Sequence, residues 1–124
     1  MEDRYLFKAK HFGEWHIGNI IKEPDGLYIR DIKENVMAYI DDESTICQCT
    51  GLKDKNGKLI WENDIVVCRD FTEEKYVIAW KQDEACFEYQ QYGCSIMNFE
   101  QLSGCEVEVI GNIFDNPELS ESEG

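Results

Sequence analysis

The chain has 124 residues, 43% of them hydrophobic and 12% aromatic, which is typical of one packed globular domain with its own core. It carries 26 acidic and 12 basic residues, and a formal net charge of -14 argues against direct binding to nucleic acid or to an anionic membrane. The same charge would attract a basic partner, although an acidic surface also keeps a small protein soluble without one.

Export from the cell is not indicated by the sequence. No run approaches the roughly 18 apolar residues that span a bilayer, and the first ten residues contain no apolar signal segment. A cytoplasmic location is therefore expected, and the six cysteines are expected to be thiols rather than a disulfide framework. Cys47 and Cys49 would share one face of a strand, whereas Cys94, which follows a glycine, is the cysteine most expected to be exposed.

Apolar and polar residues alternate with a period of two along most of the chain, which predicts short β-strands joined by turns. Strands are expected within residues 4–12, 13–21, 26–32, 35–40, 45–50, 52–61, 65–67, 74–80, 85–93 and 105–114. Residues 97–104 break the alternation and are expected to form one helical turn, with Asn98 as its N-cap. The polar, acidic residues 115–124 predict a frayed tail.

Three turns have specific residue signals. Residues 23–26 read Glu-Pro-Asp-Gly, with proline and glycine at the second and fourth positions of a turn. Asn56-Gly57 lies between two segments that can pair, and Asn-Gly is the strongest short hairpin signal because both residues tolerate positive φ. Asp64 is expected to accept a backbone N–H bond just before the apolar run 65–67.

No set of residues with catalytic or metal-binding spacing is found. His11 and His16 are separated by an odd number of positions, so they lie on opposite faces of a continuous strand unless Gly13 bends it. A zinc site is therefore not expected, and no general base, Cys–His nucleophile, calcium loop or phosphate-binding loop is indicated. We expect no metal, no cofactor and no catalytic residue.

Acidic residues gather in the expected loops, where a protein partner could meet them. The candidate partner-facing acids are Asp41, Asp42, Glu43, Glu73, Glu74, Asp83 and Glu84. Solvated loop charge is the alternative explanation for all of them.

Two stretches closely resemble the YopX family of bacteriophage and prophage proteins. Residues 50–66 read TGLKDKNGKLIWENDIV, and residues 108–119 read EVIGNIFDNPEL. The positions that form this structural signature are Thr50, Gly51, Leu52, Asp54, Asn56, Gly57, Asp64, Ile65, Val66, Gly111, Asn112 and Pro117. Residues 13–46 and 69–104 match the family in pattern only, and Cys49 stands where the family more often has tyrosine.

The resemblance implies a mainly β-fold with minor α content. It implies an N-terminal antiparallel β subdomain (residues 1–48), a small SH3-like barrel (49–116) and an acidic flexible tail (117–124), together one compact unit. It implies no established reaction. The leading hypothesis is a non-enzymatic phage accessory protein in the bacterial cytoplasm that binds a host or phage macromolecule. In a sharper version of this hypothesis, its acids imitate nucleic acid and occupy a basic host protein. A self-assembling phage module, which would form a homo-oligomer, is the first alternative, and a cysteine-dependent enzyme is the second.

Overall fold

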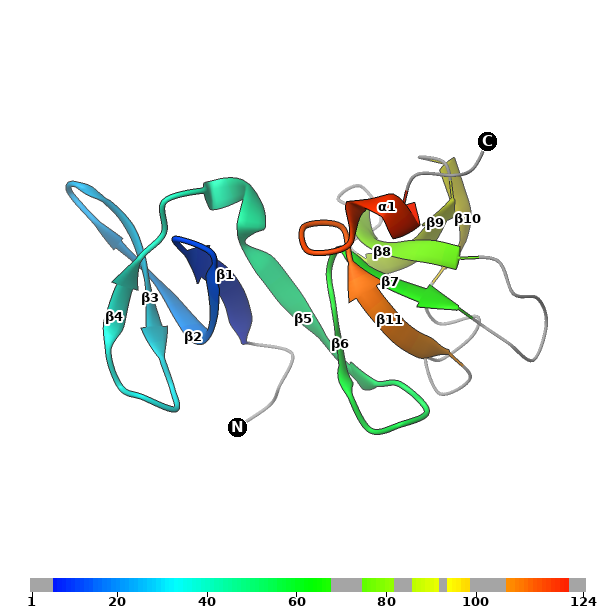
Figure 1. The fold of residues 1–124 in the computed structure, drawn as a ribbon, viewed down its shortest axis with the longest axis horizontal. Helices are drawn as coiled ribbons and strands as arrows, with labels where there is room; N and C mark the ends of the chain where they lie inside the picture. Colours follow the sequence, from blue (N-terminus) through cyan, green and yellow to red (C-terminus); the bar gives the residue numbers. More distant parts are fainter. Residues whose placement is uncertain (1–5, 68–74, 82–85, 92–93, 99–106, 121–124) are drawn as a thin grey trace. The chain divides into compact units, whose positions relative to one another are not determined.

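The computed structural model describes residues 6–67, 75–81, 86–91, 94–98 and 107–120. In these residues the chain is mainly β, with one 3-10 turn and one short α-helix, which confirms the expected fold class at this level (Figure 1). The elements in chain order are β1 (Phe7–His11), β2 (Glu14–Glu23), β3 (Gly26–Asp31), β4 (Met37–Tyr39), η2 (Glu43–Thr45), β5 (Cys47–Lys53), β6 (Leu59–Trp61), β7 (Asp64–Val67), β8 (Lys75–Lys81), β9 (Cys86–Gln91), β10 (Cys94–Asn98), β11 (Glu108–Asn112) and α1 (Pro117–Ser120).

The strands belong to two antiparallel sheets, and the chain divides into two compact units, Met1–Cys49 and Thr50–Gly124. The first sheet has the strand order β4-β3-β2-β1-β5-β6, and the second has the order β10-β9-β8-β7-β11. Strand β5 continues from one unit into the other: its first residues pair with β1, and Thr50 donates its hydroxyl to the carbonyl of Ile60 in β6.

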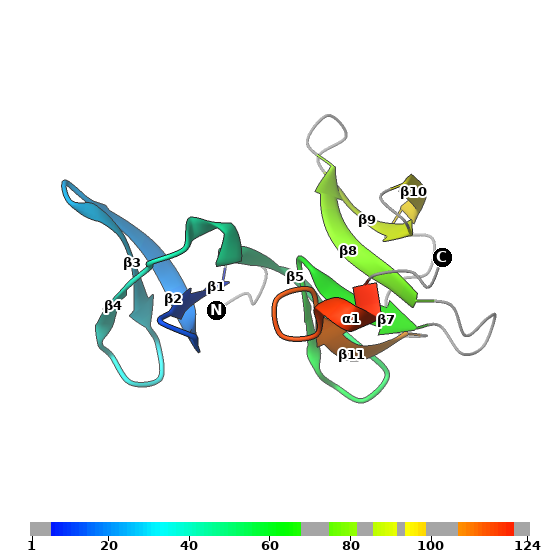
Figure 2. The same ribbon diagram turned by 45° about the horizontal axis from the view of Figure 1, so that its top comes forward.

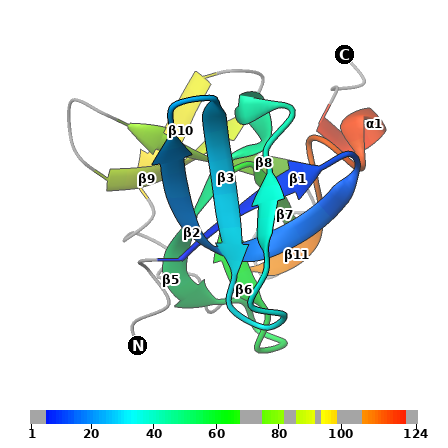
Figure 3. The same cartoon turned by 90° about the vertical axis from the view of Figure 1, so that its left-hand side faces the viewer.

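The first unit is built from tight hairpins. The turn between β2 and β3 contains only Pro24 and Asp25, because Glu23 pairs with Gly26, and this confirms the turn predicted there. Figure 3 shows β3 between β2 and β4, as the strand order requires. The core of this unit is small and consists of buried Ala9, Ile29, Ala38 and Ile40, with Ile20, Leu27 and Ile46 packed against it.

Gly18 lets β2 approach β3 closely. A Cβ added at this glycine would overlap the carbonyl oxygen of Arg30, so only hydrogen fits there. The neighbouring strand lies close because Ile32 donates its N–H to the carbonyl of Ile17 over 3.0 Å. Position 18 therefore tolerates no side chain while this pairing is kept.

The second unit has a larger apolar core. Its buried members are Ile60, Val66, Tyr76, Ile78, Tyr89 and Val107, with Phe87 and Val109 packed against them. The strands expected within residues 74–80 and 85–93 are antiparallel neighbours, in which Ile78 pairs with Tyr89 and Trp80 with Phe87. The helix α1 follows β11 in the chain and packs against β11 and β8 (Figure 2).

One expectation stays open and another needs correction. The five strands of the second sheet form an open sheet in the described residues, with β10 and β11 at its edges, so the SH3-like barrel stays a prediction. The tail was expected to fray from residue 115, but Pro117–Ser120 form α1, because Leu119 donates its N–H to the carbonyl of Asn116 and proline is well suited to a first helical turn. The helical turn expected at residues 97–104 lies mainly outside the described residues, and Asn98 itself ends β10.

Candidate functional site

The two histidines lie on neighbouring strands rather than on one continuous strand. The chain reverses at Phe12 and Gly13, whose φ angles of 46° and 92° are both positive, as a tight hairpin turn requires. His11 therefore ends β1 while His16 lies in β2 opposite Ala9, and the two ring centroids are 6.1 Å apart. The bend that the sequence left open at Gly13 is in fact a full reversal, which brings the histidines to the same end of the hairpin.

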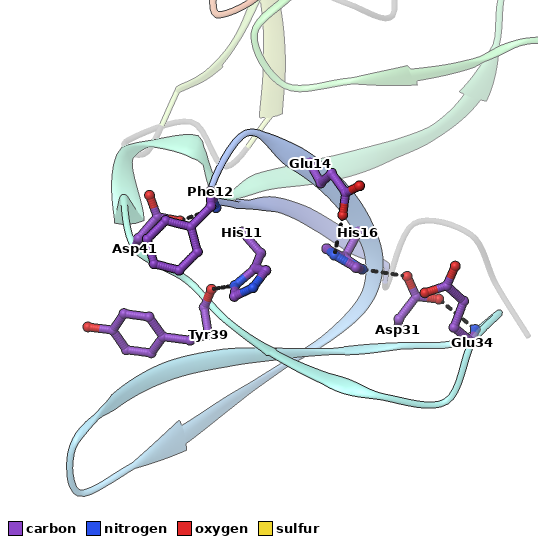
Figure 4. Close-up of polar contacts among 8 residues, drawn as sticks. All are labelled: His11, Phe12, Glu14, His16, Asp31, Glu34, Tyr39 and Asp41. Carbon is purple, nitrogen blue, oxygen red and sulfur yellow. Dashed lines mark hydrogen bonds and ion pairs between the residues drawn. The ribbon is translucent and has the colours of Figure 1, made fainter.

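His16 is the centre of a group of acids that we call the imidazole–carboxylate cluster: His16, Asp31, Glu34 and Glu14 (Figure 4). Nδ1 of His16 lies 2.8 Å from Oδ2 of Asp31, and the two side chains are only 11% and 10% exposed. His16, Asp31 and Glu34 each offer one possible ligand atom, and these three atoms all lie within 4.8 Å of one another. Three carboxylates thus surround one imidazole at the edge of the first unit's core.

Asp31 organises the loop that carries Glu34. Its Oδ1 accepts the backbone N–H groups of Lys33 and Glu34, both over 2.8 Å, so Oδ2 is left to face His16. The N–H of Glu34 lowers the pKa of Asp31 most; burial opposes this, and the hydrogen bonds from His16 and Lys33 add to the lowering. Asp31 is therefore a fixed carboxylate anion with one oxygen directed at the imidazole.

The second nitrogen of His16 has no matching partner. Nε2 is buried and has no hydrogen-bond partner among the described residues, and Oε1 of Glu14 lies 4.0 Å from it. Because the Asp31 anion accepts the proton on Nδ1, Nε2 is the ring atom left without a hydrogen bond. A buried polar atom without a partner is costly, and one in a native fold calls for a physical explanation.

His11 lies beside the cluster but is used differently. Its Nδ1 lies 2.8 Å from the backbone carbonyl of Tyr39, so this nitrogen donates, and the ring makes an edge contact with Phe12 at 4.7 Å between centroids. Phe12 itself is 71% exposed and donates its N–H to Oδ1 of Asp41 over 2.6 Å. The bonds of His11 to Tyr39 and of Phe12 to Asp41 thus hold the β1–β2 turn against the end of β4 and the segment that follows it.

The acids that were expected to face a partner differ in their contacts, and some lie outside the described residues. Asp42 accepts bonds from the N–H and the hydroxyl of Ser44 as the N-cap of η2, and these bonds lower its pKa, the hydroxyl most. Glu43 is exposed in the first position of η2, and Asp41 binds the Phe12 N–H. Glu73, Glu74, Asp83 and Glu84 lie outside the described residues.

Asp54 is the structural centre of the signature stretch. Its Oδ1 accepts the N–H groups of Asn56 and Lys58, and its Oδ2 accepts the N–H of Val109 in β11, each over 2.9 Å. Burial raises its pKa, but these three donors together outweigh burial and lower it. One buried carboxylate therefore shapes the hairpin and joins it to a strand that lies 55 residues further along the chain.

The predicted hairpin is confirmed, but with a different turn. Gly57 has φ of +85° and Asn56 does not have positive φ, and Gly57 donates to the carbonyl of Asp54 while Asp54 donates to that of Lys58. This is a type I turn followed by a glycine in the left-handed region, not the two-residue turn expected from Asn-Gly. The side chain of Asp54 decides between the two, because it binds the N–H groups on both sides of the glycine.

The remaining signature residues also have structural positions. Asp64 accepts the N–H of Trp61 over 2.8 Å, as predicted, and Ile65 and Val66 are fully buried in β7. Asn112 accepts the N–H groups of Phe114 and Asp115, and a Cβ at Gly111 would strike the side chain of Asn116. Gly51 has φ of +86°, Leu52 is 38% exposed, and Pro117 begins α1.

The imidazole–carboxylate cluster was missed in the sequence because its members are 15 or more positions from His16, Glu14 excepted. The signal that could have found it is the turn at Pro24 and Asp25. A two-residue turn there fixes the register of β2 and β3, so Gly18 pairs with Asp31, and Asp31 then lies diagonally across from His16.

Comparison with known proteins agrees with the motifs in the sequence. In the part of the chain that the structure describes, no helix has the length and apolar character needed to cross a membrane. No curated protein matches the chain in sequence. The model of the family described as YopX protein matches residues 11–121, which is nearly the whole chain and includes both the cluster and the signature stretch. The chain therefore belongs to the YopX family.

Proposed function

We propose that this YopX-family chain is a phage or prophage accessory protein that acts in the bacterial cytoplasm by binding a macromolecule rather than by catalysis. Its partner is a basic, nucleic-acid-binding host protein, and the acids of this chain take the place of nucleic-acid phosphates in the partner's groove. The second unit completes an SH3-like barrel in this proposal and displays the acids on its loops.

The observation that carries the proposal is the uneven distribution of charge. Residues 50–124 contain 16 acidic and 6 basic residues, whereas residues 1–49 contain 10 acidic and 6 basic residues. A surface with this excess attracts cationic proteins and repels phosphate, and the attraction weakens with salt. The second unit is therefore the side from which a basic partner is bound.

The described acids of the second unit include two kinds. Asp54 and Asp64 are buried and hold backbone N–H groups, so they serve the fold. Asp115 and Glu118 are exposed near α1, and we propose that the acids Glu73, Glu74, Asp83 and Glu84, which lie outside the described residues, join this second kind. The second kind is the one that a partner would contact.

The test is capture of host proteins on the immobilised full chain at low and then at high salt, with competing duplex DNA. The expected result is a basic nucleic-acid enzyme that salt releases and DNA displaces, and whose activity the chain inhibits. Direct binding of DNA to the chain, or inhibition of no captured enzyme, would contradict the proposal.

Charge variants locate the contact. The first combines Glu73→Gln, Glu74→Gln, Asp83→Asn and Glu84→Gln in the second unit; the matched control combines Glu2→Gln, Asp3→Asn, Glu23→Gln and Asp25→Asn in the first. Both change the net charge equally. We expect the first to weaken capture by at least about tenfold, because close charge pairs at interfaces couple by about 1.5 kcal/mol or more, and the control to have little effect. If both variants lost capture equally, only the total charge of the chain would matter for binding.

A second candidate function is self-assembly, and the edge strand β4 favours it. This strand has only three residues and lies at one end of the six-stranded sheet, with Met37 41% and Tyr39 40% exposed on either side of buried Ala38. Exposed edge strands can add a strand from another copy. A molar mass measured by light scattering that rises above the monomer with concentration, and falls back in Met37→Lys, would favour this function over host-protein binding.

A further inference from the structure

The first unit contains more negative charge around His16 than one imidazole can balance. Glu14, Asp31 and Glu34 contribute three carboxylates, and Asp31 is held as an anion by backbone N–H groups. No cationic side chain is recorded in contact with His16 or Asp31 among the described residues. A group of this composition can be balanced by a bound cation.

We propose that His16, Asp31 and Glu34 form a binding site for a divalent transition-metal ion of the zinc type, with Nδ1 of His16 and Oδ2 of Asp31 as two of its ligands. This site is independent of the proposed function, since it lies in the first unit and involves none of the partner-facing acids.

The distances fit such an ion. Metal–ligand bonds to histidine and carboxylate are about 2.1 Å long, so two neighbouring ligands on one ion lie about 3 to 3.5 Å apart. Nδ1 of His16 and Oδ2 of Asp31 are 2.8 Å apart and need to separate only slightly. The Glu34 side chain is exposed and its ligand atom is already within 4.8 Å of the others, so a change of rotamer completes the set.

The buried Nε2 atom of His16 is a second observation in favour of a cation. When Nδ1 binds a metal ion, the ring proton must move to Nε2, which then donates toward the carboxylate of Glu14, 4.0 Å away. Histidine ligands in proteins usually donate their other ring N–H to a carboxylate in this way. Metal binding would thus give the partnerless Nε2 a proton and an acceptor.

The ligand types determine the class of ion. One imidazole and two carboxylates suit zinc, manganese, iron or cobalt better than calcium or magnesium, which prefer oxygen ligands alone. Three protein ligands leave at least one coordination position for water. Bound there, the ion would tie the loop of residues 31–36 to β2.

The direct test is the tautomer of His16, measured by long-range proton–nitrogen NMR of the full chain with and without one equivalent of Zn²⁺. The chain has only two histidines, so His11→Gln assigns the spectrum. Without metal we expect the proton on Nδ1; with Zn²⁺ we expect it on Nε2 and a shifted, metal-bound Nδ1. Zinc held by cysteine thiols elsewhere would not change this tautomer.

Variants separate the site from other zinc binding. His16→Gln should abolish the high-affinity Zn²⁺ site in calorimetry, and Glu34→Gln, which changes an exposed side chain and keeps the fold, should weaken it by at least about tenfold. Glu14→Gln should weaken it by about tenfold, because it replaces the carboxylate that accepts from Nε2 by a weaker, neutral acceptor. His11→Gln and the exposed-acid control Glu23→Gln should leave it unchanged.

Two results would overturn the site. One is a His16 ring whose tautomer and chemical shifts do not change with Zn²⁺ up to about a millimolar, which is weak binding. The other is zinc binding that Glu34→Gln and His16→Gln leave as tight as in the unmodified chain. A His16 that is already doubly protonated at neutral pH and is not displaced by Zn²⁺ would show that a proton, not a metal, balances the carboxylates.

Discussion

The two units of this chain reach a stable β-structure by different means. In the first, the core is made of small side chains such as Ala9 and Ala38, β2 approaches β3 closely at Gly18, and the polar group at the core's edge is His16 with Asp31. In the second, large side chains such as Tyr89 fill the core, and one buried carboxylate, Asp54, holds three backbone N–H groups.

This difference explains why the family signature is concentrated in the second unit. A network in which Asp54 binds both its own turn and β11 requires particular residues at particular positions. The first unit depends mainly on alternation and on short turns, and many sequences can supply both. Residues 50–66, which contain Asp54, resemble the family residue by residue, whereas residues 13–46, like residues 69–104 of the second unit, resemble it in pattern only.

The largest expected effect is that of Asp54→Ala. Three backbone N–H groups would lose a charged acceptor in a buried position, so the free energy of unfolding should fall by about 3 kcal/mol or more, as measured by urea denaturation. Hydrogen exchange should rise at Asn56, Lys58 and Val109. Asp25→Ala, which loses only an exposed bond to Tyr28, is the control and should cost under about 0.5 kcal/mol. If hydrogen exchange rose equally across residues 6–49, the two units would unfold together, and the proposed difference between them would be wrong.

Gly18→Ala tests the first unit in the same way. The added methyl group would force β2 and β3 apart, so we expect a loss of about 2 kcal/mol. Hydrogen exchange should increase first at Ile32, whose N–H binds the carbonyl of Ile17 across this contact. If the free energy of unfolding fell no more than for the same change at an exposed strand glycine, the close approach of β2 and β3 would be contradicted.

Gly57→Ala should have a smaller effect, because this glycine is needed for its conformation and not for space. Nothing lies within 4 Å of a Cβ at this position, but φ is +85°. Alanine should therefore cost about 1 kcal/mol, and Gly57→Asn should recover part of it because asparagine tolerates the left-handed region better. Equal losses of stability in Gly57→Ala and Gly57→Asn would contradict a left-handed conformation at this position of the turn.

The smallest expected effect is a pH dependence that belongs to the second unit. The backbone donors to Asp54 outweigh its burial and lower its pKa from the ordinary value of 3.8, so the folded state holds this proton less tightly than the unfolded state. The stability from this carboxylate is complete above about pH 4 to 5 and is lost as the pH falls through the folded pKa. The urea midpoint should thus fall less steeply below pH 4 in Asp54→Asn than in the unmodified chain, while Asp25→Asn should keep the original slope.

Most of the strands could be predicted from the sequence, because their signals are local. Alternation located the strands, and the residues at 23–26 and 56–57 located two of the turns. Where a prediction from the sequence failed, a contact outside the local motif determined the structure. The turn type at Gly57 depends on the side chain of Asp54, and α1 forms where a polar tail was expected because it packs against β11 and β8.

The sequence alone thus determined the family, the β-class, the acidic excess and the two motif stretches, since each depends on residue identity or on a period of two. The tertiary structure alone decided that His16 meets Asp31 and Glu34, and that Asp54 holds β11. The first contact depends on the β2–β3 register that the turn at Pro24 and Asp25 sets, and the second joins residues that are 55 positions apart in the sequence. A register shift of one residue would reverse the faces and separate these groups, so composition and spacing could not reveal them.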